Sequence, residues 1–294
     1  MSSAVLEPEV DVKVSDEERF LFDLQGYIVL RGVLSPEEIA RYLGAVRRLE
    51  GLRYDERERL KHTIGGKTAQ PTLDEKPGHK RLNGLLRLDL CFDELIDHPA
   101  VFPRVRAFME LCRHSAEPQL VNTWSIAKAQ GHDHNGWHRG ITPDLYGHRA
   151  GKLGSRMLNT IWFLTDNGPD DGCVIAVPGS HKNHIDLNWG SPEYHGLKMP
   201  GSQCITGRAG DVLLFSEALL HTGLKKTTPG LRTNLYYNYI TLDFAGHTYS
   251  PEHNYHFVMP PSIRRRFTPR RQAATRWMET AVSIDIPPFA VDTP

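Results

Sequence analysis

The stretch Gly136-Trp137-His138-Arg139-Gly140 contains a histidine that could bind a metal ion, followed two positions later by a glycine. In a 2-His-1-carboxylate iron site, two histidines and one acid bind the same face of the ion. An H-x-D sequence would supply two of these three ligands from one short segment. This chain has H-x-G, so the acid is missing at Gly140. The chemistry expected of the site therefore depends on what replaces that acid.

Two further segments have residue types suited to the same chemistry. One is Asp171-Gly172-Cys173-Val174-Ile175-Ala176-Val177-Pro178-Gly179-Ser180-His181-Lys182, and the other is Gly210-Asp211-Val212-Leu213-Leu214-Phe215. The second continues to His221 and, eleven residues later, to Arg232. A guanidinium group can form a bidentate, charge-assisted pair with a carboxylate. The chain thus offers a second histidine ligand and an anchor for an acidic molecule.

Length and composition indicate a single large soluble domain. The chain has 294 residues, of which 39% are hydrophobic and 24% charged, which is usual for globular proteins. Lys+Arg and Asp+Glu are both 35, so the net charge is zero. A nonspecific nucleic-acid binder would usually be basic. We therefore expect a small-molecule substrate and no nucleic-acid polymer as partner.

Cysteine usage and the N-terminal residues favour a reduced, cytoplasmic location. The four cysteines form no C-x-x-C pair, so neither a zinc site nor a disulfide framework is predicted. The first twenty residues are acidic and lack the apolar core of a signal peptide. No apolar run approaches 18 residues, and we expect no association with a membrane.

The N-terminal part is predicted to be mainly helical. A short helix is expected over residues 16–24, with Phe20, Leu21 and Leu24 on one side, ending at Gly26. The β-branched and aromatic residues 27–30 predict a strand. Ser35-Pro36-Glu37-Glu38 forms a capping box with proline at the first helical position, which predicts a helix to about residue 49. Residues 51–83 are expected to form a long loop. Residues 86–92 are expected to form a strand with Leu86, Leu88, Leu90 and Phe92 on one face. Residues 99–112 are expected to form a helix whose inward side chains are Val101, Val105, Phe108 and Met109.

Short strands dominate the second half. They are expected over 121–127, 157–164, 173–177, 211–215 and 231–241, with a long loop over 128–156 and a helix near 269–281. Such strands following an N-terminal helical part favour a β-sandwich or barrel with added helices.

Together with the N-terminal GYIVLRGVLSPEEIARY, the three segments resemble the phytanoyl-CoA dioxygenase family of iron(II)/2-oxoglutarate oxygenases over roughly residues 20–245. The resemblance implies a mainly β, double-stranded β-helix (jelly-roll, cupin-like) core with N-terminal helices and long lid loops. The expected organisation of the chain is a flexible tail at 1–15, one domain over 16–282 and a tail at 283–294. By position, His138 and His221 would bind Fe(II), and Arg232 would bind 2-oxoglutarate, with O2 as the other substrate. His181 matches a histidine that is usually structural in the family.

The glycine at position 140 is similar to the H-x-G motif of iron/2-oxoglutarate halogenases. By this resemblance, the missing acid leaves room for chloride or bromide beside the iron, and the halide restores the lost negative charge. The predicted function is halogenation of an unactivated aliphatic carbon of a free small molecule in secondary metabolism.

Three alternatives compete with halogenation. Another acid could complete the iron site: Glu217, Asp144 or Asp133. Glu217 and His221 would be roughly 13 Å apart on one continuous strand, too far to share an ion, so that only a bulge or a helical turn would bring them together. A hydroxylase could instead bind water at the iron coordination position that the missing acid at Gly140 leaves open. The jelly roll could also be a non-catalytic binding module.

Residues near the site and basic clusters give weaker predictions. Arg139 and Asn122 are candidates for contacts around the halide, and Trp124, Trp137 and Trp162 for contacts to the substrate, with ordinary loop, strand or core positions as the alternative. The basic residues fit either a solvated surface or an anionic substrate such as a nucleotide. They are Lys225, Lys226, Arg264, Arg265, Arg266, Arg270 and Arg271.

Overall fold

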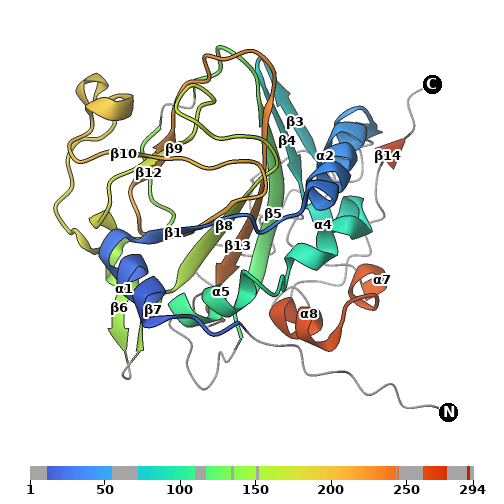
Figure 1. Cartoon of the computed structure of the whole chain (residues 1–294), viewed down its shortest axis with the longest axis horizontal. Coiled ribbons are helices and arrows are strands. Elements are labelled where there is room, and N and C mark those ends of the chain that lie inside the picture. The colour runs from blue at the N-terminus through green and yellow to red at the C-terminus, as the bar shows by residue number, and fades with distance from the viewer. Residues whose placement is uncertain are drawn as a thin grey trace, which may run out of the picture.

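Two β-sheets face each other and form the centre of the molecule (Figure 1). The computed structural model describes residues 12–54, 72–109, 117–133, 136–149, 152–242, 244, 261–276 and 290–291. The predicted tails, much of the loop over 51–83 and the end of the helix predicted at 269–281 lie partly or wholly outside these residues.

The larger sheet has seven strands in the order β1-β11-β8-β13-β5-β4-β3, and each neighbouring pair is antiparallel. The smaller sheet has the order β10-β9-β12. This pair of antiparallel sheets confirms the predicted jelly-roll core. The strands of the larger sheet are β1 (Tyr27–Leu30), β3 (Leu73–Lys76), β4 (His79–Asn83), β5 (Gln119–Lys128), β8 (Met157–Phe163), β11 (Val212–Ser216) and β13 (Arg232–Ile240). The remaining strands are β9 (Val174–Ala176), β10 (Gln203–Ile205), β12 (His221–Gly223) and the pairs β6 (Tyr146–Arg149) with β7 (Lys152–Ser155) and β2 (Arg53–Tyr54) with β14 (Ala290–Val291).

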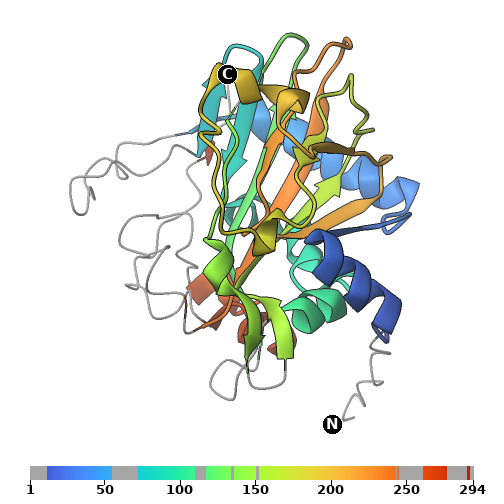
Figure 2. The same cartoon turned by 90° about the vertical axis from the view of Figure 1, so that its left-hand side faces the viewer.

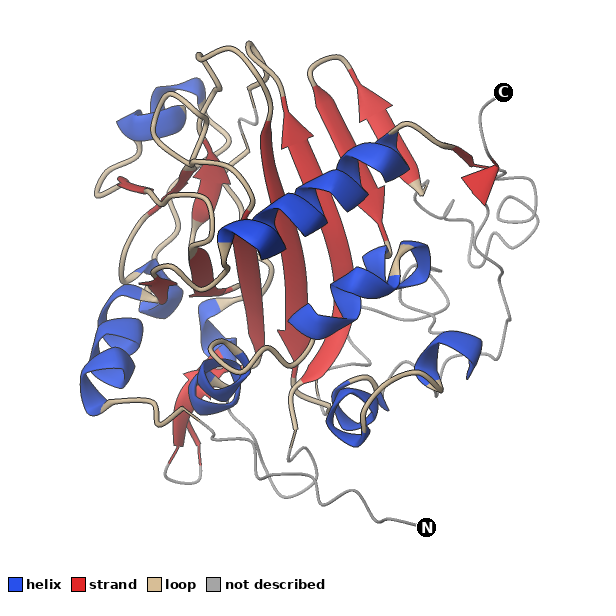
Figure 3. Cartoon of the chain, turned by 45° about the vertical axis from the view of Figure 1, so that its right-hand side comes forward, coloured by secondary structure: helices blue, strands red, loops and turns tan. Residues whose placement is uncertain are grey.

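Alternation along each strand divides the larger sheet into two apolar faces. On β13, Tyr237 belongs to the outer core and Tyr236 to the inner one, which faces the smaller sheet. The helix α2 (Pro36–Glu50) crosses the outer face (Figure 3) and packs Tyr42, Val46 and Leu49 against it. Because neighbouring side chains on a strand point to opposite faces, only every second residue of these strands can reach the space between the sheets.

Helices cover the outer face and one end of the sandwich. The predicted capping box of α2 is present, since the Ser35 hydroxyl accepts from the Glu38 backbone N–H and the Glu38 carboxylate accepts from the Ser35 N–H. Figure 2 shows α1 and α5 together at one end, near the β6–β7 hairpin. The other α-helices are α1 (Asp16–Gln25), α4 (Leu85–Leu88), α5 (Phe102–Phe108), α7 (Pro261–Arg264) and α8 (Pro269–Ala274). Short 3-10 helices span Leu90–Leu95, Pro143–Leu145, Ser180–Lys182, Pro192–Tyr194 and Gly196–Lys198. Within the described ranges, no helix is both long and apolar enough to span a bilayer.

Four local predictions were wrong. Within the loop expected over 128–156, the strands β6 and β7 pair with each other. Residues 72–83 form the β3–β4 hairpin, which extends the larger sheet, where a loop was expected. Residues 85–95 form α4 and a 3-10 helix where a strand was expected, because the Asp89 side chain accepts from the Cys91 N–H and starts a new turn. In α1 the buried side chain is Phe22, while Phe20 and Leu24 are exposed.

Replacing Gly26 by alanine is expected to destabilise the fold. Gly26 ends α1 with φ +84°, and an added Cβ would lie 2.5 Å from His181 Nδ1. The backbone strain costs about 1–2 kcal/mol, and overpacking adds roughly 1–3 kcal/mol. Chemical denaturation of Gly26→Ala measures the loss. Gly32→Ala is the matched control, because Gly32 also has a positive φ (+59°) but nothing lies within 4 Å of its added Cβ. Equal losses in the two variants would contradict the contact with His181.

Candidate active site

A cavity of about 360 Å³ lies between the two sheets. Its lining residues come from β4, β5, β8, β11 and β13 of the larger sheet and from β9, β12 and the adjoining loops. They include His138, Gly140, His221 and Arg232, so the cavity brings together the residues that the sequence singled out.

The two histidines lie side by side because their backbones pair. His138 and His221 form an isolated antiparallel bridge with reciprocal N–H to carbonyl hydrogen bonds of 3.0 and 3.1 Å. Their ring centres are 4.3 Å apart. Each Nδ1 lies 2.7–2.8 Å from a backbone carbonyl, that of Gly136 or Leu219. Since a carbonyl only accepts, each Nδ1 donates, and the lone pair of each ring is on Nε2. This tautomer suits metal binding through Nε2.

Glu217 fills the space beside Gly140. The Gly140 N–H donates to the Glu217 carbonyl at 2.8 Å. A Cβ added to Gly140 would lie 3.0 Å from both Cβ and Cδ of Glu217, and its closest contact would be Glu217 Oε2. Position 140 carries no carboxylate, but the Glu217 carboxylate lies in the space that a side chain at position 140 would enter.

A turn before β12 explains how Glu217 reaches this position. β11 ends at Ser216, and the Leu219 N–H donates to the Ser216 carbonyl at 2.9 Å. The chain then enters β12 at His221. As a result, Glu217 and His221 both face the segment His138–Gly140. The separation of about 13 Å holds only for one extended strand, so that estimate does not apply here.

The Glu217 carboxylate is buried and held by two amides. Its Oε1 accepts from the side-chain nitrogens of Asn159 and Asn238 at 2.9 and 3.0 Å. Burial raises the pKa of Glu217, while His138 and the two amides oppose that rise. Among the described residues, no three His, Cys, Asp or Glu side chains converge as a metal-binding group. The site as it stands is two adjacent histidines with an amide-held carboxylate alongside.

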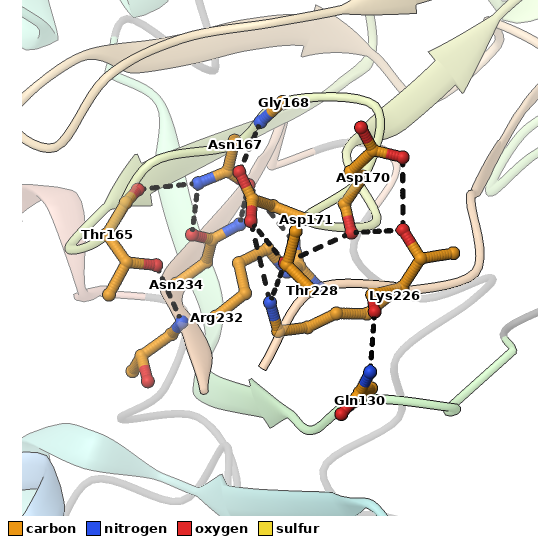
Figure 4. A network of polar contacts seen from close by, with 12 residues as sticks. Gln130, Thr165, Asn167, Gly168, Asp170, Asp171, Lys226, Thr228, Arg232 and Asn234 are labelled. Carbon is orange, nitrogen blue, oxygen red and sulfur yellow. Dashed lines mark hydrogen bonds and ion pairs between the residues drawn. The ribbon is translucent and has the colours of Figure 1, made fainter. Parts of the chain in front are cut away.

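Arg232 lies at another part of the cavity and fits an anionic molecule. It is buried, and its Nη1 donates to Asn167 Oδ1 at 3.2 Å (Figure 4). Its Nε is buried without a partner. A buried guanidinium with an unsatisfied N–H is suited to a carboxylate, so the position fits the far carboxylate of 2-oxoglutarate.

Of the two residues predicted to contact the halide, Asn122 lines the cavity and Arg139 does not. Asn122 lines the cavity, and its Oδ1 is buried without a partner. Arg139 does not line it, because its guanidinium pairs with Asp186 at 2.6 Å and donates to the Ser180 carbonyl. The halide contact predicted for Arg139 is therefore not supported by its position.

Neither Trp137 nor Trp162 is among the residues that line the cavity. Trp162 lies in the outer core, since on β8 it is Ile161 that faces inward. Trp137 donates its indole N–H to the Tyr194 carbonyl at 2.8 Å and packs in a separate apolar cluster. The positions of these two side chains therefore give their predicted substrate contacts no support.

Of the alternative acids, Asp144 and Asp133 lie outside the cavity lining, as do the basic residues. Asp144 lies 3.3 Å from His184 at the surface, and Asp133 lies 3.5 Å from His195. Lys226 is buried near Asp171 and Thr228 (Figure 4). Two C-terminal arginines form the ion pairs Arg266–Asp93 and Arg271–Asp97. These pairs join the C-terminal helical segment to the 3-10 helix Leu90–Leu95 and to the residues just after it. They leave the substrate prediction for Lys226, Arg266 and Arg271 without support.

Several cavity residues were missed by sequence reasoning. They are Asn159, Asn238, Lys128, Tyr236 and Arg81. Trp124, which was predicted from the sequence, lines the cavity, stacks on Tyr236 at 5.1 Å and has the Arg81 guanidinium 4.9 Å from its ring. A period of two counted along β13 from Arg232 gives Tyr236 and Asn238. Because every second side chain of a strand points to the same face, this count could have identified Tyr236 and Asn238 as cavity residues.

Known proteins resemble the chain over most of its length. The model of the phytanoyl-CoA dioxygenase family matches residues 22–234. Ectoine dioxygenase from Nocardia farcinica is 24% identical over 257 residues, covering 79% of each chain. Ectoine dioxygenase from Stutzerimonas stutzeri is 33% identical over 110 residues, covering 31% of this chain and 36% of its own.

A solved structure shares the fold. HygX from Streptomyces hygroscopicus with nickel, 2-oxoglutarate and hygromycin B bound is 22% identical, with a TM-score of 0.61, over 78% of this chain and 88% of its own. Because the family model covers most of the chain, the protein belongs to the phytanoyl-CoA dioxygenase family of iron(II)/2-oxoglutarate-dependent oxygenases.

Proposed function

We propose that this protein hydroxylates an unactivated carbon of a free small molecule, with His138, His221 and Glu217 as ligands of Fe(II). The observation that supports hydroxylation is the Glu217 side chain in the space beside Gly140. A carboxylate there supplies the acid of a 2-His-1-carboxylate site from a different segment of the chain.

Each part of the site has a distinct role in this function. The backbone carbonyls of Gly136 and Leu219 hold the two imidazoles in the metal-binding tautomer. Asn159 and Asn238 hold the Glu217 carboxylate, and Arg232 binds the far carboxylate of 2-oxoglutarate. The bound iron, with 2-oxoglutarate and O2, supplies the oxidising power, and 2-oxoglutarate becomes succinate and CO2.

The wall opposite the small sheet suits a polar or anionic substrate with an apolar or flat part. Trp124 and Tyr236 stack with an angle of 6° between their rings, and Arg81 adds a positive charge over the indole. Aromatic faces and a guanidinium together bind such molecules. The names of the relatives, ectoine dioxygenase and HygX with hygromycin B, also refer to small molecules.

Halogenation with chloride or bromide is the second candidate, favoured by Gly140. An H-x-G segment carries no ligand carboxylate of its own. A halide beside Gly140 would meet the Glu217 carboxylate, and two adjacent anions repel each other. Hydroxylation therefore fits the site better as long as Glu217 is present.

Anaerobic absorption spectroscopy separates these functions without the substrate. Fe(II) and 2-oxoglutarate are added to the protein, and the visible charge-transfer band is recorded with and without chloride. We expect a band that is indifferent to chloride in the unmodified protein and that becomes sensitive to chloride in Glu217→Ala. A saturable chloride shift in the unmodified protein would favour halogenation. A missing band would favour a non-catalytic binding module.

A further inference from the structure

Lys128 and Arg232 form a pair of buried cations at one part of the cavity. They lie directly opposite each other on β5 and β13. Both line the cavity, with exposures of 2% and 4%. Two neighbouring positive charges in a buried place are unfavourable unless an anion lies between or beside them.

Among the described residues, no acid lies at this part of the cavity lining. Glu217 is the only Asp or Glu among the described residues that line the cavity, and its Oε1 is held by the asparagine amides. The Lys128 ammonium donates to the Leu224 carbonyl at 2.9 Å, which is a neutral acceptor. Asp171 pairs with Lys226 and Thr228 (Figure 4). The pair of cations therefore lacks a carboxylate in direct contact.

The surroundings of Lys128 lower its affinity for a proton. Burial, and secondly the charge of Arg232, lower the pKa of Lys128 to about 7. The groups near Lys128 whose pKa is shifted, His79, His132 and Cys173, are uncharged near pH 8. Burial lowers the pKa of His79, paired with Lys128 across β4, to about 4, and also lowers that of His132. Burial raises the pKa of the Cys173 thiol to about 12, and Asp133 adds a nearby negative charge.

We infer that Lys128 is a second positioning residue for the cosubstrate, binding the far carboxylate of 2-oxoglutarate together with Arg232. This inference rests on the proposed function, since it assumes that 2-oxoglutarate binds at Arg232. A carboxylate between the two cations would satisfy the Arg232 Nε and favour the ammonium form of Lys128. Binding would then draw one proton from solvent onto Lys128, with no other bond changed. It also gives the site a preference for 2-oxo acids with a second carboxylate.

Calorimetry with the anaerobic Fe(II) protein tests this role. Titration of 2-oxoglutarate at pH 8 in buffers of different ionisation enthalpy measures the protons taken up. With a pKa of about 7, most Lys128 is neutral at pH 8, so we expect uptake approaching one proton. The affinity should be highest below pH 7 and fall as the pH rises above it. In Lys128→Met, which is similar in size and uncharged, proton uptake should disappear and the Kd for 2-oxoglutarate should rise roughly tenfold.

Pyruvate and thermal unfolding provide the controls. Pyruvate lacks the far carboxylate, so its affinity should be the same in Lys128→Met and the unmodified protein. Without cosubstrate and below pH 7, where Lys128 is mostly charged, Lys128→Met and Lys128→Gln should unfold at the same or a higher temperature, because a buried charge is removed. Unchanged 2-oxoglutarate affinity and proton uptake in Lys128→Met would overturn the role of Lys128. If the unmodified protein binds no 2-oxoglutarate at all, the proposed function itself fails.

Discussion

Glu217→Ala is expected to lower Fe(II) affinity and 2-oxoglutarate-dependent succinate formation by at least about 100-fold. Loss of a residue that only supports a metal ligand costs 10–100-fold, and Glu217 is proposed as a ligand itself. Metal titration and succinate analysis measure the two losses. Glu217→Gln keeps the size of the side chain and removes its charge. A similar loss in that variant would assign the effect to the carboxylate, and full activity in both would overturn the assignment of Glu217.

Moving the acid back to position 140 should restore the site. In Gly140→Asp alone, the new side chain meets Glu217 Cβ and Cδ at 3.0 Å, so overpacking should cost roughly 1–3 kcal/mol of unfolding free energy. In the double variant Gly140→Asp, Glu217→Ala that obstacle is gone and an H-x-D segment is present. We expect iron binding to recover to within about tenfold of the unmodified protein. If the double variant binds iron no better than Glu217→Ala, the two positions do not exchange their carboxylates.

Arg232→Met is expected to weaken 2-oxoglutarate binding by roughly 100-fold. Hydrogen bonds to a charged group contribute about 1.5–3 kcal/mol, and Arg232 is buried with its Nε lacking a partner inside the protein. The charge-transfer band, titrated with 2-oxoglutarate under anaerobic conditions, gives the Kd. Arg232→Lys keeps the positive charge but cannot form a bidentate pair with a carboxylate, so it should recover only part of the affinity for 2-oxoglutarate.

Arg139→Met is the control for this arginine. Arg139 is next to His138 in the sequence, but its guanidinium pairs with Asp186 and does not line the cavity. Its replacement should change the Kd for 2-oxoglutarate by less than about threefold. A larger effect at Arg139 than at Arg232 would mean that the anchor has been placed at the wrong residue.

The sequence predicted the parts of the fold that local patterns determine. The capping box at Ser35 and the apolar strands β8, β11 and β13 formed as expected, because each depends on neighbouring residues. Resemblance to a family identified His138, His221 and Arg232 as candidate site residues, and in the structure all three line one cavity. Alternating apolar residues did not identify α4 and the 3-10 helix after it, since a side-chain cap at Asp89 overrides the pattern.

Residues brought together by tertiary structure could not be predicted in the same way. The position of Glu217 depends on a turn between β11 and β12, and sequence separation says little about distance across a turn. Trp162 is a suitable residue type for substrate contact, but the register of β8 turns it to the outer core. Lys128 gains its significance only from Arg232 on the neighbouring strand.

The close approach of positions 140 and 217 also constrains how this site could have changed during evolution. Two acids cannot occupy the shared space without displacing each other. A lineage that moves its acid from one position to the other would therefore pass most easily through a form with a small residue at both. That transitional form would have an open place beside the metal, which is the arrangement expected of a halogen-transferring enzyme. With Glu217 as the ligand proposed above, relocating one carboxylate would link two reaction types by single substitutions, and a search for H-x-D alone would overlook proteins that have the acid at the second position.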